Sequence, residues 1–153
     1  MSFRGVATSL FVGFTLAFIT LYDIRFAFML LAAFYLVKAF IQVKGKDKFD
    51  SFQKITNIDR YNEYIKKDAV FKKFIKSDPI ADIIMAGLFI YMSFREYNFF
   101  NNVKYALIMF SIIMINYFAD LYALKKSSTW LDYKKKNMLL IMGIMVIILF
   151  FAV

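Results

Sequence analysis

Runs of apolar residues, each long enough to cross a bilayer, constrain this chain more than any other feature of its sequence. The first two runs, residues 5–22 and 26–43, have 18 residues each and are separated by only three residues. A helix rises 1.5 Å per residue, so each run would be about 27 Å long, close to the hydrocarbon thickness of a membrane. Two spans joined by so short a turn must be antiparallel neighbours.

Three further apolar runs follow a polar interval. The third is expected to begin at Pro79, because the first helical position does not need the N–H that proline lacks. With 61% hydrophobic residues, well above the roughly 45–50% of soluble domains, most of the surface must face lipid. We expect an all-α fold: one integral membrane helical bundle over residues 1–153, with five transmembrane helices and a cytoplasmic interfacial amphipathic helical segment. The expected spans are about 5–22, 26–43, 79–97, 103–124 and 137–153, with a cytoplasmic segment at 44–78 and a cytoplasmic loop at 125–136.

Basic residues are distributed unequally between the two sides of such a bundle. With five spans, the N-terminus, residues 44–78 and residues 125–136 share one side, and they carry 16 of the 20 Lys and Arg residues. Positively charged loops stay on the cytoplasmic side of a membrane. The sequence therefore predicts a multi-pass protein of a bacterial inner membrane or an organelle membrane, with its N-terminus cytoplasmic and its C-terminus outside. Losing one span would break this distribution, which favours five spans over four.

The chain contains no His and no Cys. Zinc, haem and copper sites therefore lack their usual ligands, and thiol nucleophiles and imidazole acid–base catalysis are excluded. Neither a Gly-rich phosphate loop nor another catalytic signature occurs. We expect a protein without enzymatic activity, cofactor or metal.

Small residues recur every four positions along the first span, at Gly5, Ser9, Gly13 and Ala17. This spacing forms one helix face on which another backbone can approach closely, the chief source of attraction between helices in lipid. The face is interpreted first as a packing seam against the second span. The alternative is a homo-oligomer seam or a docking face for a partner helix.

Polar residues also occur inside the predicted spans, as a cluster of Lys38, Asp82, Asn116 and Asp120. The three charged members lie roughly 6–9 Å inside the cytoplasmic face at 1.5 Å per residue. Asp120 needs a counter-charge or water because it lies near a helix C-terminus, where the helix dipole disfavours a carboxylate. We predict an ion pair between Lys38 and either Asp120 or Asp82. The cluster is interpreted as structural, with a proton or cation site as the alternative.

The polar interval at residues 44–78 holds ten basic and six acidic residues among aromatic and aliphatic ones. Its apolar spacing predicts two helices, the second beginning at a capping box from Thr56 to Asp59 and ending near Lys76. Such a helix suits an anionic membrane surface, and Trp130 suits the headgroup level. The interleaved acids argue against nucleic acid as a partner. The residues expected to contact the membrane surface or a partner are Tyr61, Lys66, Lys67, Phe71, Lys72, Phe74 and Trp130.

These features predict a protein that acts by binding, as an accessory or assembly subunit of a membrane complex or as an immunity-type protein. The expected partners are a bilayer with anionic headgroups and either a second copy of the chain or another membrane protein. The alternative is a homo-oligomeric channel, a holin-like pore or a small transporter that uses the intramembrane Asp and Lys residues. An intramembrane enzyme using Asp residues is the least favoured reading.

Overall fold

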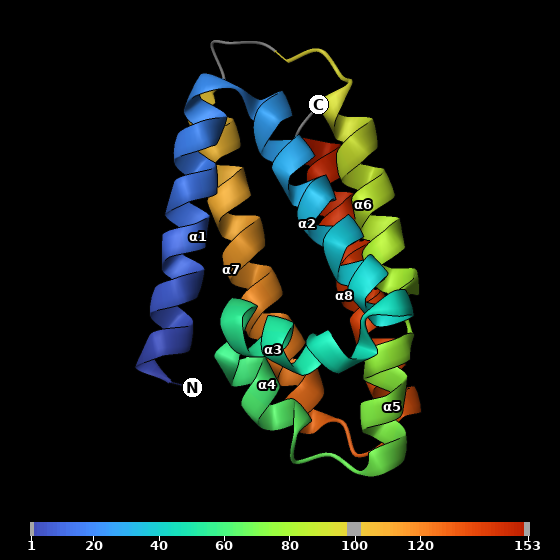
Figure 1. Ribbon diagram of the computed structural model, residues 1–153. Helices are drawn as coiled ribbons and strands as arrows, with labels where there is room; N and C mark the ends of the chain where they lie inside the picture. The colour runs from blue at the N-terminus through green and yellow to red at the C-terminus, as the bar shows by residue number, and fades with distance from the viewer. Residues whose placement is uncertain (1, 98–101, 152–153) are drawn as a thin grey trace.

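The structure is a computed structural model that describes residues 2–97 and 102–151, and within these ranges it contains helices and no strand. Long helices stand side by side, and short ones close one end of the bundle (Figure 1). The helices are α1 (Phe3–Tyr22), α2 (Ile24–Lys44), α3 (Lys46–Thr56), α4 (Ile58–Tyr64), α5 (Ala69–Ser77), α6 (Ile80–Ser93), α7 (Asn102–Lys126) and α8 (Trp130–Phe151).

Three of the long helices, α1, α2 and α7, are long and apolar enough to cross a membrane. Asp23 is the whole connection between α1 and α2: its N–H bonds to the carbonyl of Ile19, and its carboxylate caps α2 through the N–H groups of Arg25 and Phe26. The antiparallel hairpin predicted for the first two apolar runs is therefore present. α1 packs mainly along α7, and α2 packs mainly along α6.

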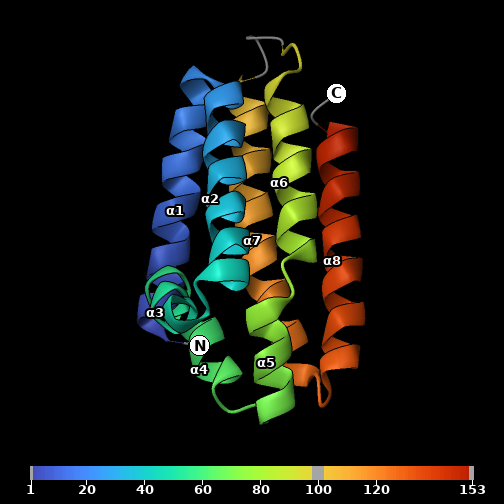
Figure 2. The ribbon, with the colours of Figure 1, turned by 45° about the vertical axis from the view of Figure 1, so that its right-hand side comes forward.

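The two remaining long helices depart from their predicted bounds. α6 has 14 residues and ends at Ser93, where the predicted span continued to residue 97. Beyond that end the chain folds back, and the Tyr97 hydroxyl donates to the carbonyl of Met92 over 2.8 Å. α8 begins at Trp130, so residues 130–136, which were predicted to belong to a loop, are helical. An ion pair of 2.8 Å between Lys136 and Asp132, four residues apart, stabilises this part of the helix. α6 and α8 run alongside the other long helices (Figure 2).

The polar interval forms three short helices, not two. Asn57, one residue after the predicted cap Thr56, caps α4 by accepting a bond from the N–H of Arg60 over 3.0 Å. The helix predicted to reach Lys76 ends at Tyr64, and a new one starts where the Asp68 carboxylate accepts from the N–H of Phe71 over 2.7 Å. These helices close the end of the bundle where the chain's N-terminus lies (Figure 1).

Two apolar cores result from this packing. The larger joins residues of the long helices, including Phe28, Phe89 and Ile144. The smaller fastens α3–α5 to the ends of α7 and α8 and includes Phe49, Phe71 and Leu124. The short helices therefore belong to the folded bundle and close it at one end.

Candidate functional site

Lys38 on α2 and Asp82 on α6 form an ion pair of 2.6 Å between Nζ and Oδ1. Asp82 lies in the first turn of its helix, where the dipole favours a carboxylate, and its side chain is buried. The pair predicted for Lys38 therefore forms, with Asp82 as its partner and not Asp120. It joins the two helices that pack most closely with each other.

Asp120 on α7 binds Arg60 of α4. Arg60 Nε donates to Asp120 Oδ2 over 2.6 Å, its Nη1 to Gln53 Oε1 over 2.6 Å and its Nη2 to the Tyr133 hydroxyl over 3.1 Å. The Tyr133 hydroxyl in turn donates to Asp120 Oδ1 over 2.9 Å. This network therefore ties α3, α4, α7 and α8 together at one point.

The environment of Arg60 keeps its guanidinium charged. Burial alone would lower its pKa, but the Asp120 carboxylate and the Tyr133 hydroxyl act in the opposite sense and hold that pKa above its ordinary value. A buried charge is tolerated when it is paired and its hydrogen bonds are satisfied. The site therefore contains two compensated ion pairs and no free proton donor at Arg60.

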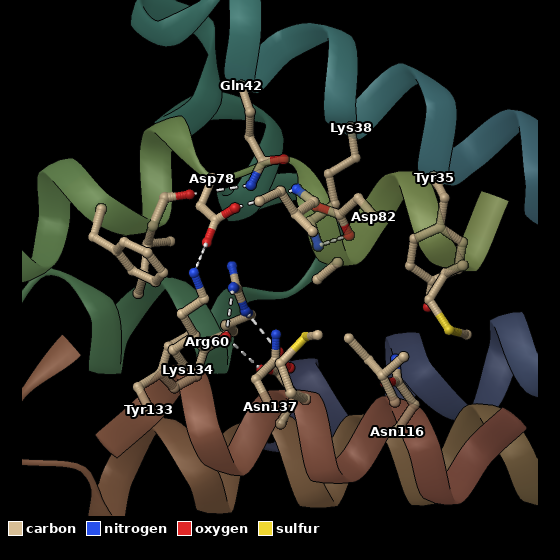
Figure 3. Close-up of a pocket in the computed structure, with 18 residues that line it drawn as sticks. Tyr35, Lys38, Gln42, Arg60, Asp78, Asp82, Asn116, Tyr133, Lys134 and Asn137 are labelled. Atoms are coloured by element: carbon tan, nitrogen blue, oxygen red, sulfur yellow. Dashed lines mark hydrogen bonds and ion pairs between the residues drawn. The ribbon is translucent and has the colours of Figure 1, made fainter. Parts of the chain in front are cut away.

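Two cavities meet at these ion pairs. One, of about 80 Å³, lies among α2, α6, α7 and α8, and Figure 3 shows the side chains that line it, with Lys38 directed toward Asp82 and Arg60 directed toward Tyr133. The other, of about 520 Å³, is a mainly apolar cleft among α1, α2 and α7 with α3 and α4 at its end. Five residues line both cavities: Tyr35, Lys38, Arg60, Asn116 and Asp120.

A separate polar contact holds the N-terminal end of α1 against α4. Asp59 accepts hydrogen bonds from the N–H of Ser2 over 2.8 Å and from the hydroxyl of Tyr117. Burial raises the pKa of Asp59, but these hydrogen bonds outweigh it and hold that pKa below its ordinary value of 3.8. The carboxylate is therefore ionised at neutral pH and fixes where α1 begins.

The small residues of α1 do not form the predicted seam against the second span. A methyl group on Gly5 would overlap the Asp59 carboxylate and approach the Tyr117 hydroxyl, and one on Gly13 would meet the ring of Phe110 on α7. Both glycines are buried, and the helices that approach them closely are α4 and α7. For these two residues the predicted contact with the second span was therefore wrong. Ser9 and Ala17 are half-buried, and Ser9 lines the large cleft.

The residues expected on a membrane surface are divided between the interior and the surface. Phe71 is 1% exposed and packs in the smaller core, so its placement on the membrane surface was wrong. Phe74 and Trp130 pack together with ring centroids 4.8 Å apart, and Tyr61 packs against the same core. The three lysines of this set interact with other parts of the chain. Lys67 donates a hydrogen bond to the carbonyl of Ser127, Lys72 donates one to the carbonyl of Ile65, and Lys66 forms an ion pair with Glu63.

Sequence reasoning missed Arg60, Gln53 and Tyr133. One signal could have found Arg60: it is the only arginine among the ten basic residues at 44–78, and arginine suits buried pairs better than lysine. Tyr133 gave no comparable signal, because its contact with Arg60 joins segments 73 residues apart. Gln53 lies only seven residues from Arg60, but their contact depends on how α3 and α4 pack.

The site offers hydrogen-bonding and charged groups but no metal cage. Within residues 2–97 and 102–151, no group of three or more His, Cys, Asp or Glu side chains is placed to hold a metal ion. Comparison with models of protein families, with curated proteins and with solved structures found no match to this chain. Function must therefore be argued from the geometry alone.

Proposed function

We propose that this chain is a five-span integral membrane protein that acts by binding, without catalysis, as an accessory or assembly subunit of a membrane complex or as an immunity-type protein. The observation that carries the proposal is that each charged residue of the polar cluster is paired within the bundle. Lys38 pairs with Asp82 and Arg60 with Asp120, both at 2.6 Å. Charges that are paired inside the bundle are stable in a membrane and hold the helices that carry them in a fixed arrangement, which a partner can recognise.

The five-span arrangement is supported by the helices that pack along α2 and α7. α6 lies along α2, and α8 lies along both α7 and α6. Short helices can cross a membrane when the bilayer thins locally around them. In this arrangement α3–α5 lie on the cytoplasmic side, together with the N-terminus.

Cysteine labelling tests this topology cleanly, because the chain has no cysteine of its own. Ser128→Cys lies in the exposed connection between α7 and α8, and Arg25→Cys lies at the opposite end of the bundle. In intact cells, a membrane-impermeant maleimide should label Arg25→Cys only, and both variants after the cells are opened. Labelling of Ser128→Cys from outside would refute the orientation.

Mass measurement in mild detergent tests the binding role. A stoichiometric complex with a different membrane protein is expected for an accessory or immunity-type role, and a defined homo-oligomer would show that the partner is a second copy. A lone monomer that binds nothing would refute the proposal.

A transporter is the alternative that one observation favours. Lys38, Arg60 and Asp120 line both the polar cavity and the apolar cleft, so a second state that joins the two would open a continuous route past Asp120. Proteoliposomes containing the chain should then pass protons or cations, and Asp120→Asn should abolish the flux while the protein remains monodisperse. If the unaltered protein passes no protons or cations, the transporter alternative is refuted and the proposed binding role is retained.

A further inference from the structure

Gln42 on α2 has a side-chain oxygen, Oε1, with no hydrogen-bond partner among the residues that the structure describes. The residue is buried, with 3% of its surface exposed. Its Nε2 donates to the carbonyl of Ile75 on α5 over 3.1 Å, so the reverse orientation of the amide would set two oxygens against each other. A buried acceptor without a donor is unfavourable. This oxygen therefore indicates a donor that the described side chains do not supply.

Gln42 lines the polar cavity of about 80 Å³, whose charged groups balance. Its lining includes three cations and three carboxylates, and each of them belongs to an ion pair. The pairs are Lys38–Asp82, Arg60–Asp120 and Lys134–Asp78, at 2.6, 2.6 and 3.8 Å. The lining therefore carries no net charge and favours a neutral occupant over an ion of either sign.

The occupant must donate a hydrogen bond to Gln42 Oε1 and also suit the amides of Asn116 and Asn137, which both donate and accept. Water meets both requirements and is uncharged. A water takes about 30 Å³ in the liquid, so the cavity has room for more than one. The lining also reaches the surface at Lys134, whose side chain is 42% exposed, so water can enter from solvent there.

We propose that the polar cavity is an internal hydration site, in which a cluster of waters donates to Gln42 Oε1 and bridges α2, α6 and α8. The side chains of Gln42, Asp82 and Asn137 border it from these three helices (Figure 3). Water at this position also hydrates the Lys38–Asp82 pair, which lowers the cost of burying its charges. The inference goes beyond the proposed binding role and needs neither its orientation nor its partner.

Nuclear magnetic resonance of the unaltered protein tests the contact at Gln42 directly. The chain has two glutamines, so ¹⁵N labelling of glutamine side chains gives two amide signals, those of Gln42 and Gln53. The Gln42 amide should show a through-space contact with water, distinguished from proton exchange by its sign. Gln53 is similarly buried, but its Oε1 accepts from Arg60 over 2.6 Å, so its water contact should be weaker. A Gln42 amide without a water contact would overturn the proposal.

Two matched cysteine variants on α6 test whether the cavity is wet. Met85 and Met92 are 3% and 0% exposed, and Met85 lines the cavity whereas Met92 does not. The two exchanges remove the same atoms, so any loosening of the core should be similar. A thiol reacts as its thiolate, which forms only where water can reach it; Met85→Cys should therefore react with methyl methanethiosulfonate at least about tenfold faster than Met92→Cys. Equal rates in the folded protein would contradict a hydrated cavity.

Exchange of the salt distinguishes water from a bound alkali cation. The melting temperature should be the same in sodium, potassium and choline chloride at equal concentration, because water needs no particular ion. A melting temperature that falls in choline for the unaltered protein, but not for Gln42→Met, would place an alkali cation on this oxygen and overturn the assignment. These measurements use purified protein in detergent, so their failure would leave the cysteine-labelled topology and the search for a partner unaffected.

Discussion

Arg60 and Asp120 lie sixty residues apart in the sequence, and their side chains meet over 2.6 Å with neither exposed by more than 16%. Removing one partner of a buried pair leaves an uncompensated charge. Arg60→Leu should therefore lower the free energy of unfolding by about 3–5 kcal/mol, measured by thermal unfolding in mild detergent. The double variant Arg60→Leu with Asp120→Leu should recover most of that loss.

The Lys66–Glu63 pair provides the control for this prediction. The Lys66 side chain is 65% exposed, and exposed pairs contribute about 0–1 kcal/mol. Lys66→Ala should scarcely change unfolding. If Arg60→Leu were no more harmful than Lys66→Ala, the buried network would not hold α4 to α7.

Gly5 permits the close contact between α1 and α4. A Cβ there would overlap the Asp59 carboxylate, so Gly5→Ala should destabilise the protein by about 1–3 kcal/mol, the usual cost of overpacking. Gly143→Ala on α8 is the matched control: nothing lies within 4 Å of an added Cβ, so alanine should be neutral or stabilising by up to about 1 kcal/mol. Equal melting temperatures for the two variants would show that α1 does not pack on Asp59.

Asp59 should make the fold sensitive to acid. Its folded-state pKa is below the ordinary value of 3.8, so its contribution is present above that pH and is lost as the pH falls through the folded-state pKa. Thermal unfolding from about pH 5 to about pH 3 should show a smaller loss for Asp59→Asn than for the unaltered chain. Tyr117→Phe, which removes one of the hydrogen bonds, should reduce the loss in the same direction. An unchanged acid sensitivity in both variants would contradict this role.

Phe71 distinguishes a packed α5 from a helix lying on the membrane surface. Its side chain is buried, so Phe71→Ala should cost about 3–5 kcal/mol of unfolding free energy. Its neighbour Val70 is 64% exposed, and Val70→Ala should change stability by less than about 0.5 kcal/mol. A surface helix would give the opposite result, with little effect of either variant on unfolding and weaker vesicle binding by both.

Apolar runs in the sequence predicted the first two long helices to within two residues of each bound. They located α8 less well, because hydropathy indicates where a chain can be in lipid and not where its helix begins. The helix extends beyond the apolar run through Lys134 to Lys136 and begins at Trp130. α6 ends at Ser93, and near this end the Tyr97 hydroxyl donates to the carbonyl of Met92, a contact that no local pattern signals.

The candidate site was predictable in part for a similar reason. The position of Asp120 near a helix end predicts that it needs a counter-charge or water, and the structure pairs it with Arg60. Lys38 was correctly expected to form an ion pair. That Arg60 is the partner of Asp120 depends on how α4 packs against α7, and this packing is set by contacts between segments that are distant in the sequence. Phe71 among lysines fits a membrane surface or a packed core equally well, and only the tertiary arrangement decides between them.

The long sequence separations within the Arg60 network set an order of events during synthesis. Arg60 leaves the ribosome sixty residues before Asp120 and 73 residues before Tyr133. Until then the guanidinium lacks Asp120 and Tyr133, and α4 cannot settle against the bundle without desolvating an unpaired charge. The helical hairpin of α1 and α2 can form first, because its contacts are local. The chain must therefore be made at least as far as the start of α8 before this end of the bundle can close.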